Sequence, residues 1–77
     1  MSGQVPKNEN DRRLGKSISE LRVRQKMPPE IVAEAARMSA EDYLKGESGE
    51  RRFAARELYF IARTLGVSME ELFSGLG

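Results

Sequence analysis

Residues 38–52 (MSAEDYLKGESGERR) hold the densest group of side chains in the sequence that could carry out chemistry. Glu41 and Asp42 are paired carboxylates, the residue type that acts as a catalytic acid and base. Adjacent residues of a helix point about 100° apart, however, so these two carboxylates do not converge on one substrate atom. The chain also has no cysteine and no histidine, which excludes thiolate and imidazole nucleophiles and the usual zinc ligands. We therefore expect a protein that is not an enzyme and that uses no cofactor or metal.

The same residues carry charges of both signs, and charge is spread unevenly along the chain. Residues 1–27 contain seven Lys or Arg and three Asp or Glu, which gives +4, whereas residues 28–52 contain four and six, which gives −2. Non-specific affinity for DNA comes mainly from Lys and Arg side chains that neutralise phosphates. The first third of the chain is therefore suited to a nucleic-acid partner, and the acidic middle opposes one.

The chain of 77 residues is long enough for one small domain. Residues 1–10 are polar and contain Gly and Pro, so we expect a disordered tail there and one folded domain at residues 11–77. No stretch approaches the roughly 18 apolar residues that a membrane span needs, and the first residues lack the apolar segment of a signal peptide. We therefore expect a cytoplasmic protein with no membrane partner.

Apolar residues recur at helical spacing in five segments, and no segment alternates with the period of a strand. The first helix is expected within residues 10–25, with Asn10 or Asp11 as its cap, and the second within residues 28–37. Ser39 caps a third helix that Gly46 or Gly49 ends. Residues 50–66 are expected to form the longest helix. The last helix follows the S-x-x-E capping box of residues 68–71.

Two short helices joined by a tight turn, inside five helices, are the layout of a helix-turn-helix domain. Four blocks, in order, resemble the Cro/C1-type (XRE-like) helix-turn-helix family: ISELRVRQKM, IVAEAARMS, ESGERR and LYFIARTLGVSMEELF. The last block is similar to the usual I-A-x-x-L-G-V-S-x-x-x-L ending of that family. The resemblance covers about residues 14–73 and implies an all-α, five-helix, lambda-repressor-like domain that binds double-stranded DNA.

The resemblance also implies which residues face the DNA. The recognition helix would be residues 39–46, with Ala40, Glu41 and Lys45 at base edges in the major groove and Ser39 near the backbone. Glu41 could accept a hydrogen bond from cytosine N4, or it could simply favour the positive end of the helix dipole. Lys45 could contact a guanine or a phosphate, or remain solvated.

Phosphate contacts are expected on either side of that helix. By resemblance, the loop after it faces the phosphates, with Arg51 and Arg52 supplying positive charge. Arg12, Arg13 and Lys16 of the first helix are in a region that flanks the recognition helix in this fold. These cations would have to outweigh the acids of residues 28–49, where five acids and two bases give −3.

Two positions match residues that form an internal ion pair in the family, Arg22 late in the first helix and Glu47 after the recognition helix. We expect this pair to stabilise the fold, because burying one charge without the other is costly. Tyr43 falls on an apolar position of the family and is expected in the core.

The sequence departs from the family at three places. Pro28 and Pro29 replace the Ser/Thr and Gln that contact a phosphate at the start of the second helix. Arg37 stands where the turn usually has Gly, so a positive φ there would carry a modest strain. Gly46 stands where a large apolar residue is usual, and we expect thinner packing and a shorter helix. The chain is therefore interpreted as a divergent member.

The expected function is that of a sequence-specific transcriptional regulator in the cytoplasm, associated with the nucleoid. A domain of this size reads few base pairs, so it would act as a homodimer on a two-fold site. Leu72, Phe73 and Leu76 are the candidate dimer contacts, unless they pack back onto the first helix. The alternative is an interaction module that binds another regulatory protein, a polymerase subunit or a toxin, with little DNA binding of its own.

Overall fold

The computed structural model describes residues 9–73, and every regular element within this part of the chain is an α-helix. The five helices are α1 (Glu9–Arg24), α2 (Pro29–Ala35), α3 (Ala40–Ser48), α4 (Ala55–Leu65) and α5 (Met69–Phe73). The prediction of an all-α, five-helix domain is confirmed. None of these helices combines the length and apolar character that crossing a membrane requires.

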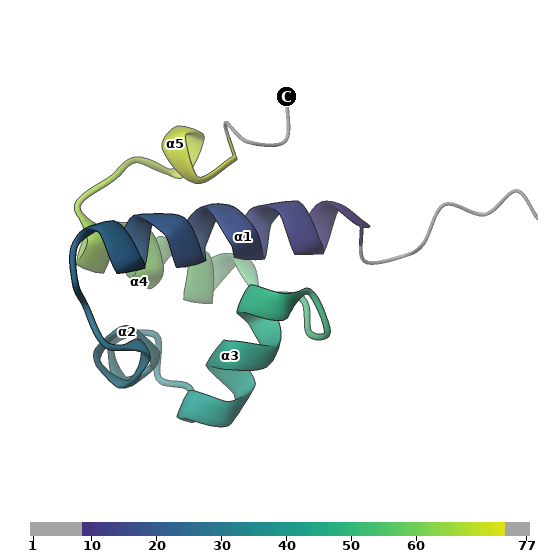
Figure 1. The fold of residues 1–77 in the computed structure, drawn as a ribbon, viewed down its shortest axis with the longest axis horizontal. Helices are drawn as coiled ribbons and strands as arrows, with labels where there is room; N and C mark the ends of the chain where they lie inside the picture. Colours follow the sequence, from purple (N-terminus) through teal and green to yellow (C-terminus); the bar gives the residue numbers. More distant parts are fainter. Residues whose placement is uncertain (1–8, 74–77) are drawn as a thin grey trace, which may run out of the picture.

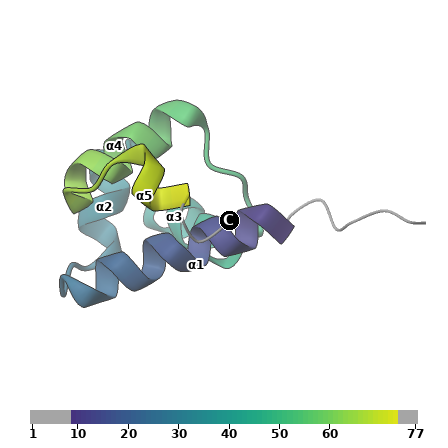
Figure 2. The ribbon, with the colours of Figure 1, turned by 90° about the horizontal axis from the view of Figure 1, so that it is seen from above.

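The long helix α1 runs through the middle of the bundle, with α5 on one side and α2 and α3 on the other (Figure 1). It packs against α3 and α5, while α2 packs against α3 and α4. The turned view shows α5 beside α4, with which it is also in contact (Figure 2). As a result, α3 is held from two sides, by α1 and by α2.

The core between these helices is apolar. No polar or charged residue among those described is buried. The buried residues include the predicted stripe of α4 and Tyr43, which is fully buried as expected. The buried hydrophobic residues are Leu14, Ile18, Val32, Ala33, Ala36, Tyr43, Phe53, Leu58, Ile61, Ala62, Leu65 and Leu72.

The C-terminal helix corrects one expectation about self-association. Leu72 is completely buried, because α5 packs back against α1 and α4; of the two alternatives for this residue, packing back onto the first helix is the one observed, and Leu72 is not exposed for a dimer contact. Phe73 keeps 38% of its surface exposed. Leu76 lies outside the described residues.

Two helix boundaries also differ from expectation. The first helix begins at Glu9, so Asn10 and Asp11 lie inside its first turn and do not cap it. Of the predicted tail at residues 1–10, only the last two residues are described, and both are helical. The helix expected over residues 50–66 is not the longest, because α4 begins only at Ala55. The Glu57 carboxylate accepts a hydrogen bond from the Ala54 backbone N–H at 2.8 Å and fixes that start.

The expected caps are present at α3 and α5. The hydroxyl of Ser39 accepts a hydrogen bond from the Asp42 backbone N–H at 3.1 Å. Ser68 and Glu71 form a reciprocal capping box, with hydrogen bonds of 2.9 and 3.1 Å. Each bond satisfies a backbone N–H that the first turn of a helix leaves without a partner.

Four helices end in the same way, with a residue in the left-handed conformation after the last turn. Gly49 and Gly66 hold this position after α3 and α4, with φ of 86° and 72°. Lys26 and Arg37 hold it after α1 and α2, with φ of 57° and 61°. The turn of the helix-turn-helix therefore needs a positive φ at Arg37. This backbone conformation is strained for arginine, because its Cβ atom lies too close to the following carbonyl, and glycine would avoid the strain.

The closest approach of α1 and α3 occurs at Gly15. A Cβ atom on this residue would overlap the backbone carbonyl oxygens of Gly46 and Glu47. A Cβ on Gly46 would in turn overlap the Phe53 ring. The expectation of thinner packing and a shorter helix at Gly46 is therefore wrong. Helix α3 continues past Gly46 to Ser48, and the Phe53 side chain fills the space beside it.

We predict that Gly15→Ala destabilises the protein by about 3 kcal/mol, because backbone carbonyls cannot move aside as a flexible side chain would. The change should appear as a lower midpoint of urea unfolding. Glu20→Ala, at an exposed position of the same helix, is the control and should stay within about 0.5 kcal/mol. A stabilisation of about 0.5–1 kcal/mol, usual for Gly→Ala inside a helix, would show that the helices are not in backbone contact here.

We predict that Arg37→Gly raises the free energy of unfolding by about 0.5–1 kcal/mol, since relief of the left-handed strain exceeds the entropy that glycine adds to the unfolded chain. The reverse change, Gly66→Ala, should lower it by about 1 kcal/mol, because nothing lies within 4 Å of the added Cβ and only backbone strain changes. Thermal unfolding measures both. Equal signs for the two variants would contradict the assignment of strain.

Candidate nucleic-acid interface

Helix α3 lies at the edge of the bundle, on the side of α1 away from α5 (Figure 1). Tyr43 and Gly46 face the core, so the opposite row of exposed residues is Glu41, Lys45 and Ser48. The Lys45 ammonium lies 3.8 Å from the Glu41 carboxylate, and their side chains are 48% and 80% exposed. Two of the three residues predicted at base edges are thus exposed together and neutralise each other. The third, Ala40, is half-buried.

An ion pair anchors α3 to α1. The Arg22 Nε and Nη2 atoms donate to the two carboxylate oxygens of Glu47 at 2.7 and 3.1 Å, and Nη1 donates to the Met27 carbonyl at 2.9 Å. Both side chains are largely covered, at 13% and 8% exposure. The hydrogen bond with Glu47 raises the pKa of Arg22 above its ordinary value. Removing one member of such a pair would cost about 3–5 kcal/mol, so its role in the fold is structural.

Tyr43 lies beside this pair. Its hydroxyl is buried and has no hydrogen-bond partner among the described residues. Burial, followed by the nearby Glu47 carboxylate, raises the pKa of Tyr43 well above its ordinary value. The side chain is therefore a neutral core residue and does not face a ligand.

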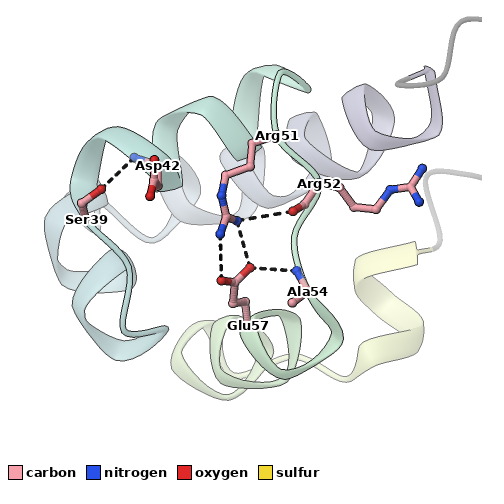
Figure 3. Close-up of polar contacts among 6 residues, drawn as sticks. All are labelled: Ser39, Asp42, Arg51, Arg52, Ala54 and Glu57. Atoms are coloured by element: carbon pink, nitrogen blue, oxygen red, sulfur yellow. Dashed lines mark hydrogen bonds and ion pairs between the residues drawn. The ribbon is translucent and has the colours of Figure 1, made fainter.

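The loop between α3 and α4 is fixed by Arg51 (Figure 3). Its Nη1 and Nη2 atoms donate to the two carboxylate oxygens of Glu57 at 3.0 and 3.1 Å, and Nη1 also approaches the Arg52 carbonyl at 3.3 Å. The hydrogen bond from Arg51 is the main cause that holds the pKa of Glu57 below its ordinary value. Because Glu57 also binds the Ala54 N–H, Arg51 ties the loop to the first turn of α4.

The neighbouring arginine turns the other way and meets α1. The Arg52 Nε atom lies 3.3 Å from both carboxylate oxygens of Asp11. The Arg52 side chain is 73% exposed, whereas the Asp11 side chain is 16% exposed. Arg13, also predicted to contact phosphate, pairs with Glu9 at 3.5 Å.

Two of the predicted phosphate ligands form no hydrogen bond or ion pair within residues 9–73. They are Arg12 and Lys16, both exposed and one helical turn apart on α1. The stem of Arg12 crosses the end of α3, because a Cβ atom on Gly49 would overlap its Cγ atom. The structure therefore gathers Arg12 and Arg52, with Lys16 one turn further, where α1 meets the C-terminal end of α3. We call these three residues the basic cluster.

The ion pairs of the loop were not apparent from the sequence. Arg51 and Glu57 are six residues apart, and Glu57 gives only one local signal, its place in the first turn of α4. Asp11 and Arg52 are 41 residues apart and give none.

At the start of α2, Pro28 provides no side-chain cap and Pro29 is the first helical residue, so the phosphate contact usual in the family has no side-chain donor there.

Comparison with solved structures finds the same fold in two gene regulators. Two crystal structures of the clp gene regulator ClgR from Corynebacterium glutamicum match with TM-scores of 0.84 and 0.80, each at 21% identity. They cover 91% and 86% of this chain and 74% and 86% of theirs. The apo competence regulator ComR from Streptococcus vestibularis matches at a TM-score of 0.79 and 27% identity, over 86% of this chain and 22% of ComR. No family model and no curated relative matches the sequence. The likeness establishes that this chain has the five-helix, lambda-repressor-like fold with a helix-turn-helix.

Proposed function

We propose that this protein is a DNA-binding transcriptional regulator of the Cro/C1 type, which inserts α3 into the major groove. The observation that carries the proposal is the basic cluster at the exposed end of α3. Arg12, Lys16 and Arg52 supply three positive charges there, the partly covered Asp11 removes one, and the exposed Glu50, which accepts a hydrogen bond from Ser48, removes a second. The fold shared with two gene regulators supports the same conclusion.

The charge balance of α3 itself is compatible with this role. Glu41 and Lys45 cancel each other, and Glu47 is neutralised by Arg22, which leaves Asp42 as the acid of the helix that forms no ion pair among the described residues. Asp42 and Glu41 lie in the first turn, where the positive end of the helix dipole favours them. The basic cluster at the other end would face a phosphate strand beside the groove, where its charges count most toward affinity.

Binding as a homodimer is part of the proposal, because one recognition helix reads only a few base pairs and a two-fold site reads twice as many. Phe73 is one of the two residues that remain as proposed dimer contacts, and it is partly exposed on α5. Leu76, the other residue proposed for this contact, lies outside the described residues. Such a protein would work in the cytoplasm, on the nucleoid.

A second candidate function is an interaction module for another regulatory protein. It is favoured by the observation that Lys45, Arg51 and Arg52 all contact carboxylates of the same chain. Exposed acids on α2, Glu30 and Glu34, add to the negative character of that face. In this alternative the helix-turn-helix would bind a basic protein surface, and DNA affinity would be absent or weak.

The salt dependence of binding to mixed-sequence duplex DNA separates the two. With three phosphate contacts per protomer, we expect a slope of log affinity against log salt of about −2.7 for each protomer bound, so that the affinity per protomer falls about 40-fold between 50 and 200 mM salt. Arg12→Ala with Lys16→Ala should reduce the magnitude of that slope by about 1.8. Arg24→Ala, at the far end of α1, is the matched control and should leave it unchanged. Absence of binding at low salt would favour the interaction module.

Base recognition is tested by selecting binding sites from a random duplex library. Lys45→Ala should relax preference at one base pair by about 1–3 kcal/mol, since the side chain lies in the outward row of α3. Arg12→Ala should weaken all sequences alike, because phosphates carry no sequence information. A selected motif that is unchanged by Lys45→Ala would remove this residue from the base-edge set.

A further inference from the structure

We infer that Arg52, and not the adjacent Arg51, is the arginine of the α3–α4 loop that binds a phosphate group, and that Asp11 positions it. The inference rests on the proposed function in taking a DNA phosphate as the ligand. Sequence alone treats the two arginines as equivalent, and the structure separates them.

Arg51 is already occupied by a carboxylate. Both of its terminal nitrogens donate to Glu57, in the two-pronged geometry that makes arginine–carboxylate pairs strong. Glu57 is held in turn by the Ala54 N–H. A phosphate that approached both terminal nitrogens side by side would have to displace this carboxylate and release the start of α4, because only the Nε hydrogen and one Nη2 hydrogen of Arg51 remain for a new acceptor.

Arg52 is held through Nε, whereas Arg51 is held through its two terminal nitrogens. Asp11 contacts only Nε, which leaves the other four of the five guanidinium N–H donors without an acceptor among residues 9–73. The side chain extends away from Arg51 and Glu57 (Figure 3). Its terminal nitrogens match the spacing of two phosphate oxygens, and its exposure leaves them accessible.

Asp11 acts through Arg52 and not on the phosphate. Its carboxylate is mostly covered, so it lies beneath the guanidinium and limits how far that flexible side chain can move. Restricting a side chain before binding reduces the entropy lost when the ligand arrives. Asp11 is therefore a positioning residue.

Arg12 supplies the second charge of the site. It follows Asp11 in the chain, and its stem rests on the Gly49 backbone at the end of α3. Gly49 is required twice, for its φ of 86° and for the space that the Arg12 stem occupies. Arg12, Arg52 and Lys16 are opposed there by Asp11 and the exposed Glu50, which leaves an excess of one positive charge beside the single negative charge of a phosphodiester.

The first experiment compares Arg51→Ala with Arg52→Ala in the DNA salt titration. Arg52→Ala should reduce affinity about tenfold at low salt and lower the magnitude of the slope by about 0.9, with a smaller drop in melting temperature than Arg51→Ala. Arg51→Ala should lower the melting temperature and leave the slope as in the wild type. Glu57→Gln provides a second variant that releases Arg51 without deleting it, and it too should leave the slope unchanged. Equal slope losses for the two arginine variants would overturn the assignment.

The second experiment tests Asp11 by measuring the Arg52→Ala loss in three backgrounds. The loss should shrink from about tenfold in the wild type to about twofold with Asp11→Ala, where Arg52 is no longer held. It should return with Asp11→Asn, whose amide oxygen can accept from Nε. An equal loss in every background would make Asp11 irrelevant to binding. A larger loss with Asp11→Ala would make it a competitor of the phosphate.

A titration with inorganic pyrophosphate separates this inference from the proposed function. The Nε–Hε signals of Arg52 and Arg12 in NMR spectra should shift on addition of pyrophosphate, and that of Arg51 should not. A response to pyrophosphate without binding to duplex DNA would overturn the DNA-binding function and retain the phosphate site. DNA binding with the slope carried by Arg51 would do the reverse. No response to either probe would overturn both.

Discussion

The backbone contact between α1 and α3 at Gly15 is the constraint on which the remaining structure depends. It brings the two helices close enough for Arg22 to reach Glu47 with two hydrogen bonds, and for the Arg12 stem to cross the end of α3 at Gly49. A side chain at residue 15 would push α3 away from α1 and would separate all of these contacts at once. The position of the candidate recognition helix is thus set by the absence of one methyl group.

Carboxylates of the same chain decide which cations remain available for a partner. Arg51 is used to close the loop onto α4, and Lys45 is balanced by Glu41 on the exposed row of α3. Arg12 has no partner among residues 9–73, and Arg52 is engaged through one nitrogen only. A surface arranged in this way would bind a polyanion through a few defined contacts and not through a broad positive field, so its affinity would respond strongly to salt and to single substitutions.

Local signals in the sequence were sufficient for most of the fold. The periodicity of apolar residues located the helices, and the cap at Ser39 and the capping box at Ser68 located two of their starts, because these depend on residues within one turn of each other. The expectation that Gly46 would leave the core thin came from the resemblance to the family and was wrong. Its space is filled by Phe53, a residue of the following loop, and local patterns do not show how a loop returns to the core.

The sequence by itself determined the helical class, the order of the helices and the positions that face the core, since each follows from spacing and from side-chain chemistry along one helix. Only the tertiary structure decided the ion-pair partners of the two loop arginines and the burial of Leu72. Arg52 and Asp11 are 41 residues apart and meet only because α1 and α3 are packed together. Coulomb attraction between side chains depends on distance in space, and no pattern along the chain reports that distance before the helices are assembled.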